Sequence, residues 1–335
     1  MTFLWRTLVF LGLFFAQTHT AFAEKKVDHI DFDIQLIAEY PSTANSKTLK
    51  RVYIAQEKNA YLKKLGDEIG IHTLIITDSN EYLIVDPGPD GAYAHRLINQ
   101  LKKIEPELKQ HPQAIVNTVA RPEHTLANST IANKNTLILA SSTTQNNMRE
   151  RCPNCRKRLS NLLKNKKILA TPILTPNTLV QAGNYLLTNF PEWQVLEFEG
   201  RTASDLVLWN KEMGIFYAGG LVSSQSIPDL SDASLSGWIK ALEQLKQLNP
   251  KTIIGVGPYQ QFSNHQSVSD LDFTLEYLKS LEILVRTDFI AGGDAANADK
   301  CLNLEHFSSL PGYKRLHPLN VQHVWREIEL EEMNK

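Results

Sequence analysis

The chain lacks an excess of charge of either sign, and its apolar runs are short. Lys and Arg number 35 against 36 Asp and Glu, so the formal net charge is −1 over 335 residues. This balance gives no electrostatic reason to expect binding to nucleic acid or to an anionic membrane surface. No apolar run reaches the ~20 residues that a spanning helix needs, so we expect no membrane span once the leader is removed. Partners must be inferred from the chemistry of a site.

Cysteine is also scarce. Cys152 and Cys155 form Cys-Pro-Asn-Cys, and Cys301 stands alone far along the sequence. No second pair completes a structural zinc site, Arg156 stands where haem attachment requires histidine, and no strand leads directly into the pair as a thioredoxin-like motif requires. In an exported protein, we expect a disulfide between Cys152 and Cys155. A redox or ligand role for this pair is the alternative.

The first 23 residues have the pattern of a secretory signal peptide. Arg6 lies in a short n-region, an apolar run follows from Leu8 to Ala16, and Ala21-Phe22-Ala23 is a small-x-small cleavage site. The mature chain is expected to begin near Glu24. This pattern predicts a periplasmic or secreted protein.

Residues 24–335 are expected to form a single α/β domain, because 42% hydrophobic and 21% charged residues are ordinary for a globular protein. Residues 24–60 form an irregular N-terminal portion with strands expected at Ile34–Ala38 and Val52–Ala55. Further strands are predicted at His72–Thr77, Tyr82–Val85, Ala114–Thr118, Thr136–Ala140, Trp193–Phe198, Asp205–Trp209, Ile215–Ala218 and Lys251–Val256. Helices are predicted at Ala92–Ile104, around Cys152–Lys167, and at Ser234–Leu248, Val268–Phe289 and Pro318–Glu332.

The stretch 117–128 reads Asn-Thr-Val-Ala-Arg-Pro-Glu-His-Thr-Leu-Ala-Asn directly after a predicted strand. It resembles the metal loop Asn-Thr-His-x-His-x-Asp-His-x-x-x-Asn of the metallo-β-lactamase superfamily in spacing and in its flanking asparagines. By this resemblance, Val119 and Arg121 replace the first two histidines. Glu123 replaces the aspartate, and His124 is retained. A valine has no donor atom and a guanidinium stays protonated, so neither can bind zinc.

Three later segments resemble the same family, and each has lost its metal ligand. Arg201 stands at the third histidine of Gly-x-His-Thr-x-Gly-Asp-Leu, Gly220 at the bridging aspartate of Phe-Thr-Gly-Asp-Leu, and Val256 at the last histidine of Val-Val-Pro-Gly-His-Gly-Pro. Of the seven ligand positions that the family uses for two zinc ions, this chain keeps His124 and a carboxylate at Glu123. We therefore expect no bound metal and no other cofactor, although the ancestral family binds zinc.

The resemblance implies an αββα sandwich, in which helices cover both outer faces of two packed sheets. The Cys-Pro-x-Cys motif and the ending from His317 to Trp325 resemble an exported branch, the quinoprotein relay system zinc metallohydrolases. That branch is found alongside PQQ-dependent alcohol oxidation or sulfur oxidation. Membership implies a zinc-dependent hydrolase, whereas the replaced ligands favour a protein without catalysis.

Two arginines are expected to point to where a zinc ion would lie, because Arg121 and Arg201 replace histidines of the same metal position. If the pocket is open, their planar forks suit a carboxylate, a sulfate or a phosphate. Alternatively, they pair with Glu123 and Asp86 and fill the cavity as an ion-pair network.

Three functions are consistent with these patterns. The first is a pseudoenzyme that acts as a ligand-binding or partner component of a periplasmic oxidation system, with a periplasmic protein or a small anion as its partner. The second is a metal-dependent hydrolase with a reduced or relocated site that uses His124, Glu123 and either His265 or Asp86. In it, His124 is the candidate general base. The third is a thiol protein that acts through the Cys-Pro-Asn-Cys pair.

Overall fold

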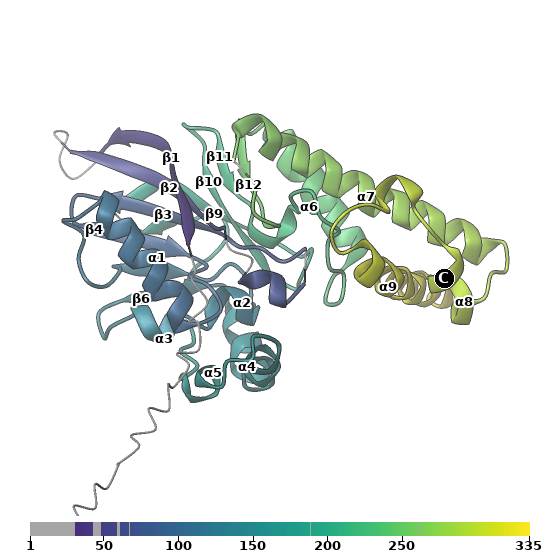
Figure 1. Ribbon diagram of the computed structural model, residues 1–335. Coiled ribbons are helices and arrows are strands. Elements are labelled where there is room, and N and C mark those ends of the chain that lie inside the picture. The colour runs from purple at the N-terminus through teal and green to yellow at the C-terminus, as the bar shows by residue number, and fades with distance from the viewer. Residues whose placement is uncertain (1–30, 43–47, 59–60, 67, 188, 261) are drawn as a thin grey trace, which may run out of the picture.

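Two β-sheets packed face to face form the centre of the computed structural model, and helices lie against both outer faces (Figure 1). This is the αββα sandwich that the sequence predicts. The structure describes residues 31–42, 48–58, 61–66, 68–187, 189–260 and 262–335, and of residues 264–267 only the backbone. The predicted signal peptide, residues 1–23, lies outside the described residues.

The first sheet has the strand order β1-β2-β3-β4-β5-β6-β7. Neighbours from β1 to β4 pair antiparallel, and neighbours from β4 to β7 pair parallel. Its strands are β1 (Phe32–Pro41), β2 (Leu49–Glu57), β3 (His72–Asp78), β4 (Glu81–Val85), β5 (Ala114–Val116), β6 (Leu137–Ala140) and β7 (Thr178–Leu179).

The second sheet has the order β12-β11-β10-β9-β8. Only the pair β11 and β12 is parallel among these described strands. Its strands are β8 (Tyr185–Leu187), β9 (Phe190–Phe198), β10 (Asp205–Asn210), β11 (Ile215–Tyr217) and β12 (Thr252–Ile254).

Both faces of the first sheet are buried, because successive side chains of a strand point to opposite faces and apolar residues occupy successive positions. In β4, Tyr82 and Ile84 pack with the helix α1 (Gly91–Ile104), whereas Leu83 and Val85 pack between the two sheets. The predicted helix Ala92–Ile104 is thereby confirmed. The side chain of Asp90 caps its first turn by accepting from the backbone N–H of Tyr93.

The second sheet follows the same rule. Leu206 and Leu208 of β10 face the first sheet, whereas Val207 and Trp209 face a helical layer. That layer contains α6 (Leu235–Gln247), α7 (Asn264–Ile290) and α9 (Tyr313–Met333). Figure 1 shows α7, α9 and the short α8 (Ala295–Cys301) extending beyond the sheets.

Three predicted segments differ from the structure in their bounds. Residues 24–60 were expected to be irregular apart from short strands at Ile34–Ala38 and Val52–Ala55, but β1 and β2 form a long antiparallel hairpin on the edge of the first sheet, with a bulge between Leu36 and Ala38. The helix predicted around Cys152–Lys167 begins earlier, at Ser142, and ends at Leu162. The C-terminal helix begins at Tyr313, five residues before the predicted start at Pro318. A proline lacks a backbone N–H, so it is tolerated near the beginning of a helix and does not have to be its first residue.

Shorter helices connect the strands at the edge where the candidate site lies. The longer α4 begins at Ser142, directly after β6, and contains both clustered cysteines. The remaining helical segments are η1 (Leu62–Lys64), α2 (Pro122–Thr125), α3 (Asn128–Ile131), α4 (Ser142–Leu162), α5 (Lys167–Ala170), η2 (Gly219–Leu221) and η3 (Glu305–Phe307).

None of the helices in the described part of the chain combines the length and the apolar character needed to cross a lipid bilayer.

A filled centre at the edge of the sandwich

The predicted site residues meet at one edge of the sandwich, where loops leave the carboxyl ends of β4, β5, β11 and β12. Asp86 follows β4, residues 117–124 follow β5, Gly220 follows β11, and Val256 follows β12. Arg201 precedes β10, which runs antiparallel to β11, and so reaches the same edge. The segments that the family resemblance identified therefore lie together at one edge of the structure.

Asp86 is the polar hub of this edge and is completely buried. Its carboxylate accepts hydrogen bonds from the backbone N–H of Thr118 at 2.9 Å and from the Thr118 hydroxyl at 2.6 Å. It also accepts from His124 Nδ1 at 3.0 Å and from the Tyr217 hydroxyl at 3.1 Å. These donors already satisfy Asp86, so the predicted pairing of Asp86 with arginines is wrong.

Arg201 occupies the space beside Gly220. A Cβ atom added to Gly220 would lie 2.3 Å from Arg201 Nη1 and 2.8 Å from its Cδ, so aspartate at position 220 is excluded while Arg201 keeps this position. The Arg201 side chain is 7% exposed and forms an ion pair with Glu123 at 4.0 Å. Burial and the charge of Arg121 lower the pKa of Arg201. Arginine at position 201 and glycine at position 220 are therefore structurally linked.

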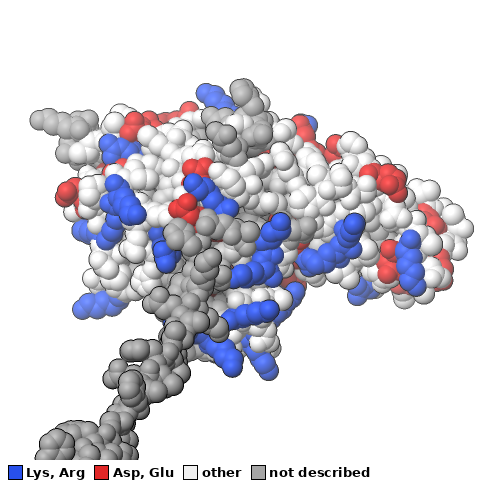
Figure 2. Space-filling model, viewed as in Figure 1, with Lys and Arg blue, Asp and Glu red and all other residues white. Residues whose placement is uncertain are grey.

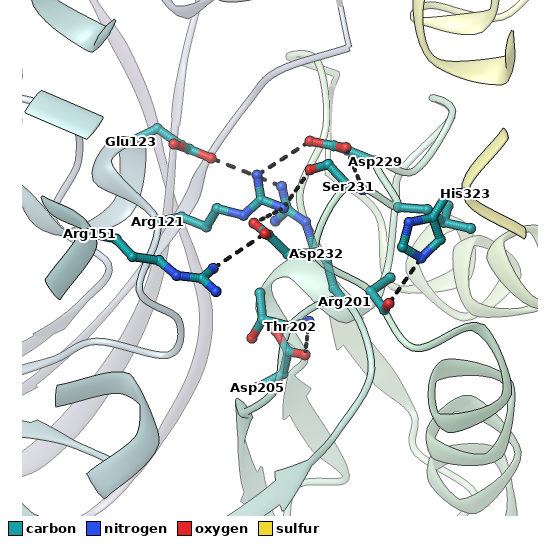
Figure 3. Close-up of polar contacts among 12 residues, drawn as sticks. Arg121, Glu123, Arg151, Arg201, Thr202, Asp205, Asp229, Ser231, Asp232 and His323 are labelled. Carbon is teal, nitrogen blue, oxygen red and sulfur yellow. Dashed lines mark hydrogen bonds and ion pairs between the residues drawn. The ribbon is translucent and has the colours of Figure 1, made fainter. Parts of the chain in front are cut away.

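Arg121 turns toward a loop that precedes α6 (Figure 3). Its Nη1 donates to Asp229 at 3.3 Å, and its Nη2 lies 3.4 Å from both Asp232 Oδ2 and Ser231 Oγ. Burial opposes its charge, but Glu123, Asp229 and Asp232 outweigh burial and raise the pKa of Arg121. Arg121 is thus already paired.

The same contacts raise the pKa of Arg121 and lower the pKa of Asp229. Burial favours its neutral form, yet the charges of Arg121 and Arg201 hold the pKa of Asp229 at about 2. The expected ion-pair network is present between Arg201 and Glu123, but Arg121 is matched by Asp229 and Asp232. Sequence reasoning missed these two aspartates, because their loop carries no motif that relates it to the loop after β5.

The space left at this centre is small. A cavity of about 30 Å³ lies among Glu123, His124, Arg201, Ser223 and Val256, among other residues. Such a volume holds about one water molecule. Its lining includes carboxylates, but Glu68, Glu123 and Asp229 each pair with an arginine. One nitrogen of His124 is bonded to Asp86, and Val256 has no donor atom.

The residues present do not fit the two zinc ions of the family that the sequence resembles. Val119 is fully buried and apolar, and Arg201 brings a positive charge into the centre. Within the described residues, no group of three or more His, Cys, Asp or Glu side chains is placed to hold a metal ion. The alternative ligand His265 lies outside the described side chains.

The cysteine pair lies inside α4, about three turns after its start. All three cysteines are free thiols in the structure, with Cys152 buried, Cys155 partly buried and Cys301 exposed, so the predicted Cys152–Cys155 disulfide is not formed in it. Burial raises the pKa of Cys152 to about 12 and also raises that of Cys155. Neither thiol lies at a helix N-terminus, where a thiolate would be stabilised.

His72 lies near the same edge, and its burial should make the stability of the protein depend on pH. It is 3% exposed, and its Nε2 has no hydrogen-bond partner within the described structure. Burial lowers its pKa to about 4, against a hydrogen bond to the backbone of Gly255. Because the unfolded value is about 6.5, the unfolded chain binds this proton first, and stability is lost as the pH falls from about 6.5 through 4. The loss attributable to His72 should reach about 3 kcal/mol.

Urea denaturation of wild type and His72→Gln at pH 7.5 and pH 4 tests this dependence. The comparison must be between the two proteins, since Asp205 and Asp270 have pKa values raised to about 6 by burial and act in the opposite sense. We expect His72→Gln to lose less stability on acidification than wild type. Parallel losses in both proteins would show that His72 is not the titrating group.

Known proteins share the architecture of this chain. No family model matches it, and no curated protein matches it. Among solved structures, the metallo-beta-lactamase IND-7 is 19% identical, with a TM-score of 0.53, over 74% of this chain and 98% of its own. A metallo-beta-lactamase from Erythrobacter litoralis is 11% identical, with a TM-score of 0.53, over 73% of this chain and 100% of its own.

A larger protein is also similar. The stereoselective inverting sec-alkylsulfatase Pisa1 from Pseudomonas sp. is 10% identical, with a TM-score of 0.63, over 82% of this chain and 48% of its own. At such identities the similarity concerns the path of the backbone and carries no information on activity. Together with the two packed sheets and their helical layers, these likenesses show that the chain has the metallo-β-lactamase fold.

Proposed function

We propose that this protein is an exported pseudoenzyme with the metallo-β-lactamase fold, which acts as a ligand-binding or partner component of a periplasmic quinoprotein-type oxidation system. The observation that carries the non-catalytic assignment is the position of Arg201, whose side chain takes the space that an aspartate at position 220 would need. The signal-peptide pattern supports export. The Cys-Pro-x-Cys motif and the C-terminal sequence support the quinoprotein association.

The loss of the metal ligands removes the chemistry on which such hydrolases depend. A metal centre lowers the pKa of bound water and stabilises the charge that develops during hydrolysis. Here His124 could act only as a general base, which by itself supplies about 10²–10⁴-fold acceleration. Arg201 places a fixed positive charge near His124, since both line the same cavity. This arrangement favours binding without turnover.

The two alternative functions find less support in the geometry. A relocated metal site would need His124, Glu123 and Asp86 to converge, but Asp86 is held by hydrogen bonds and Glu123 faces Arg201. Thiol chemistry would need an accessible thiolate. Burial instead keeps Cys152 and Cys155 protonated.

Metal analysis tests the proposed function directly. Protein purified without added zinc should contain far less than one equivalent of zinc or iron per chain, because too few donor side chains converge at the centre. Elemental analysis by mass spectrometry measures this, with His124→Ala as the matched variant. We expect the same low content in both proteins. One equivalent of metal in wild type that is lost in His124→Ala would establish the relocated metal site instead.

A further inference from the structure

A larger pocket, of about 270 Å³, lies beside the filled centre. Four arginines line it, and we call it the arginine pocket after them: Arg121, Arg151, Arg158 and Arg315. Arg151 and Arg158 lie on α4, Arg121 precedes α2, and Arg315 lies in the first turn of α9. Figure 2 shows basic side chains gathered over the part of the surface where α4 lies. Segments far apart in the sequence thus give one pocket a concentration of guanidinium groups.

Each carboxylate that lines the arginine pocket already pairs with an arginine. Asp229 pairs with Arg121, and Asp232 pairs with both Arg121 and Arg151 (Figure 3). Glu123 pairs with the buried Arg201, which does not line this pocket. The ion pairs made by Arg121 are 3.3 to 3.4 Å long, and its buried Nε has no hydrogen-bond partner within the described residues.

Arg158 lines the pocket without an ion-pair partner among the described residues. It is exposed, and no hydrogen bond or ion pair joins it to any described residue. Arg315, by contrast, is engaged by Glu68. A guanidinium group at the mouth of a pocket, with no carboxylate to neutralise it, suits a carboxylate or a sulfate as its partner.

Part of the lining of the pocket is apolar. Leu65, Ile69, Leu159 and Leu162 contribute to it, and Leu162 is 41% exposed. Burying such side chains against an apolar group is favourable. The volume lies just below the ~300 Å³ at which sites for drug-sized ligands begin. The ligand should therefore be small, with a charged head and a short apolar body.

We propose that the arginine pocket binds a small amphipathic anion, a carboxylate or sulfate on a short apolar chain, with Arg158 and Arg121 at its head group and the leucines of α4 at its chain. This inference rests on the proposed function, because a protein without turnover can hold such a ligand unchanged. The proposed anion site also differs from the one expected from the sequence, which used Arg121 and Arg201. Arg201 is buried and does not line this pocket, and Arg158 is proposed as an anion ligand instead.

Calorimetric titration of the full mature chain tests the proposal with three probes, hexanoate, hexyl sulfate and inorganic sulfate. Wild type should bind the two hexyl anions and bind inorganic sulfate more weakly. Arg158→Gln should weaken both hexyl anions by about tenfold, since it removes a charge-assisted contact. Arg149→Gln is the matched control, because Arg149 is exposed on the same helix but does not line the pocket. It should leave the affinities unchanged.

Three outcomes would overturn the proposal: no saturable binding of either hexyl anion, equal weakening by Arg158→Gln and Arg149→Gln, or an affinity for inorganic sulfate equal to that for hexyl sulfate. Metal analysis of the same preparation separates this inference from the function on which it rests. Metal-free protein that binds no probe contradicts the arginine pocket alone. Protein with one equivalent of metal contradicts the pseudoenzyme, whatever its affinity for the probes.

Discussion

Replacing Asp86 by alanine should lower the free energy of unfolding by about 3–5 kcal/mol, the range seen when one partner of a buried charged network is removed. The substitution leaves the N–H and hydroxyl of Thr118, Nδ1 of His124 and the hydroxyl of Tyr217 without their acceptor. Each of these groups is buried, so water cannot replace the carboxylate. Urea denaturation at pH 7 measures the change.

Three further variants distinguish the role of Asp86 as a hydrogen-bond acceptor from an ordinary loss of surface charge. Asp272→Ala removes an exposed aspartate that pairs with Lys246 at the surface and should cost less than about 1 kcal/mol. Tyr217→Phe removes one donor to Asp86 and should cost about 1 kcal/mol. Asp86 has a left-handed backbone, with φ 52, which asparagine also tolerates, so Asp86→Asn tests the carboxylate without changing that preference. Equal losses for Asp86→Ala and Asp272→Ala would contradict the role of Asp86.

Most of the fold could be predicted because local patterns and tertiary packing agree. The short β-rich runs of β3 and β4 mark two strands, and the turn at Ser79-Asn80 joins them in the predicted hairpin, with Ser79 in the left-handed region at φ 57. The regular spacing of apolar residues likewise located α1 and α6. The edge strand β1 and its neighbour β2 extend beyond their predicted cores, because their length depends on pairing with each other and on the pairing of β2 with β3.

The site could be located from the sequence, but its interactions could not. The resemblance to the metallo-β-lactamase superfamily placed Arg121, Arg201 and Gly220 at one edge, because its motifs follow or precede strands whose ends meet there. The partners of Arg121 come from residues 229–232, more than a hundred positions away, and an ion pair leaves no periodic signal in a single sequence. The same holds for the hub at Asp86, whose donors come from the loop after β5, from α2 and from β11.

Gly220→Ala should lower the free energy of unfolding by about 1–3 kcal/mol, the usual effect of adding a methyl group to a filled core. The added Cβ would meet Arg201 at Nη1 and Cδ, and Arg201 has little room to move, because it is 93% buried by its surroundings. Urea denaturation of Gly220→Ala in the wild-type and Arg201→Ala backgrounds measures the coupling between the two positions.

The double-mutant cycle decides what requires glycine at position 220. If Arg201 requires it, Gly220→Ala should be nearly neutral once Arg201→Ala has emptied the space, and Arg201→Lys, which retains the Cδ atom, should relieve the clash only in part. An equal cost in all three backgrounds would place the requirement in the backbone of residue 220 instead. A strong coupling would also mean that Gly220→Asp alone cannot restore a metal ligand, since the aspartate has room only when Arg201 is replaced as well. Packing around Arg201 would then oppose a metal ligand at position 220, in addition to the absence of donor atoms at the neighbouring positions.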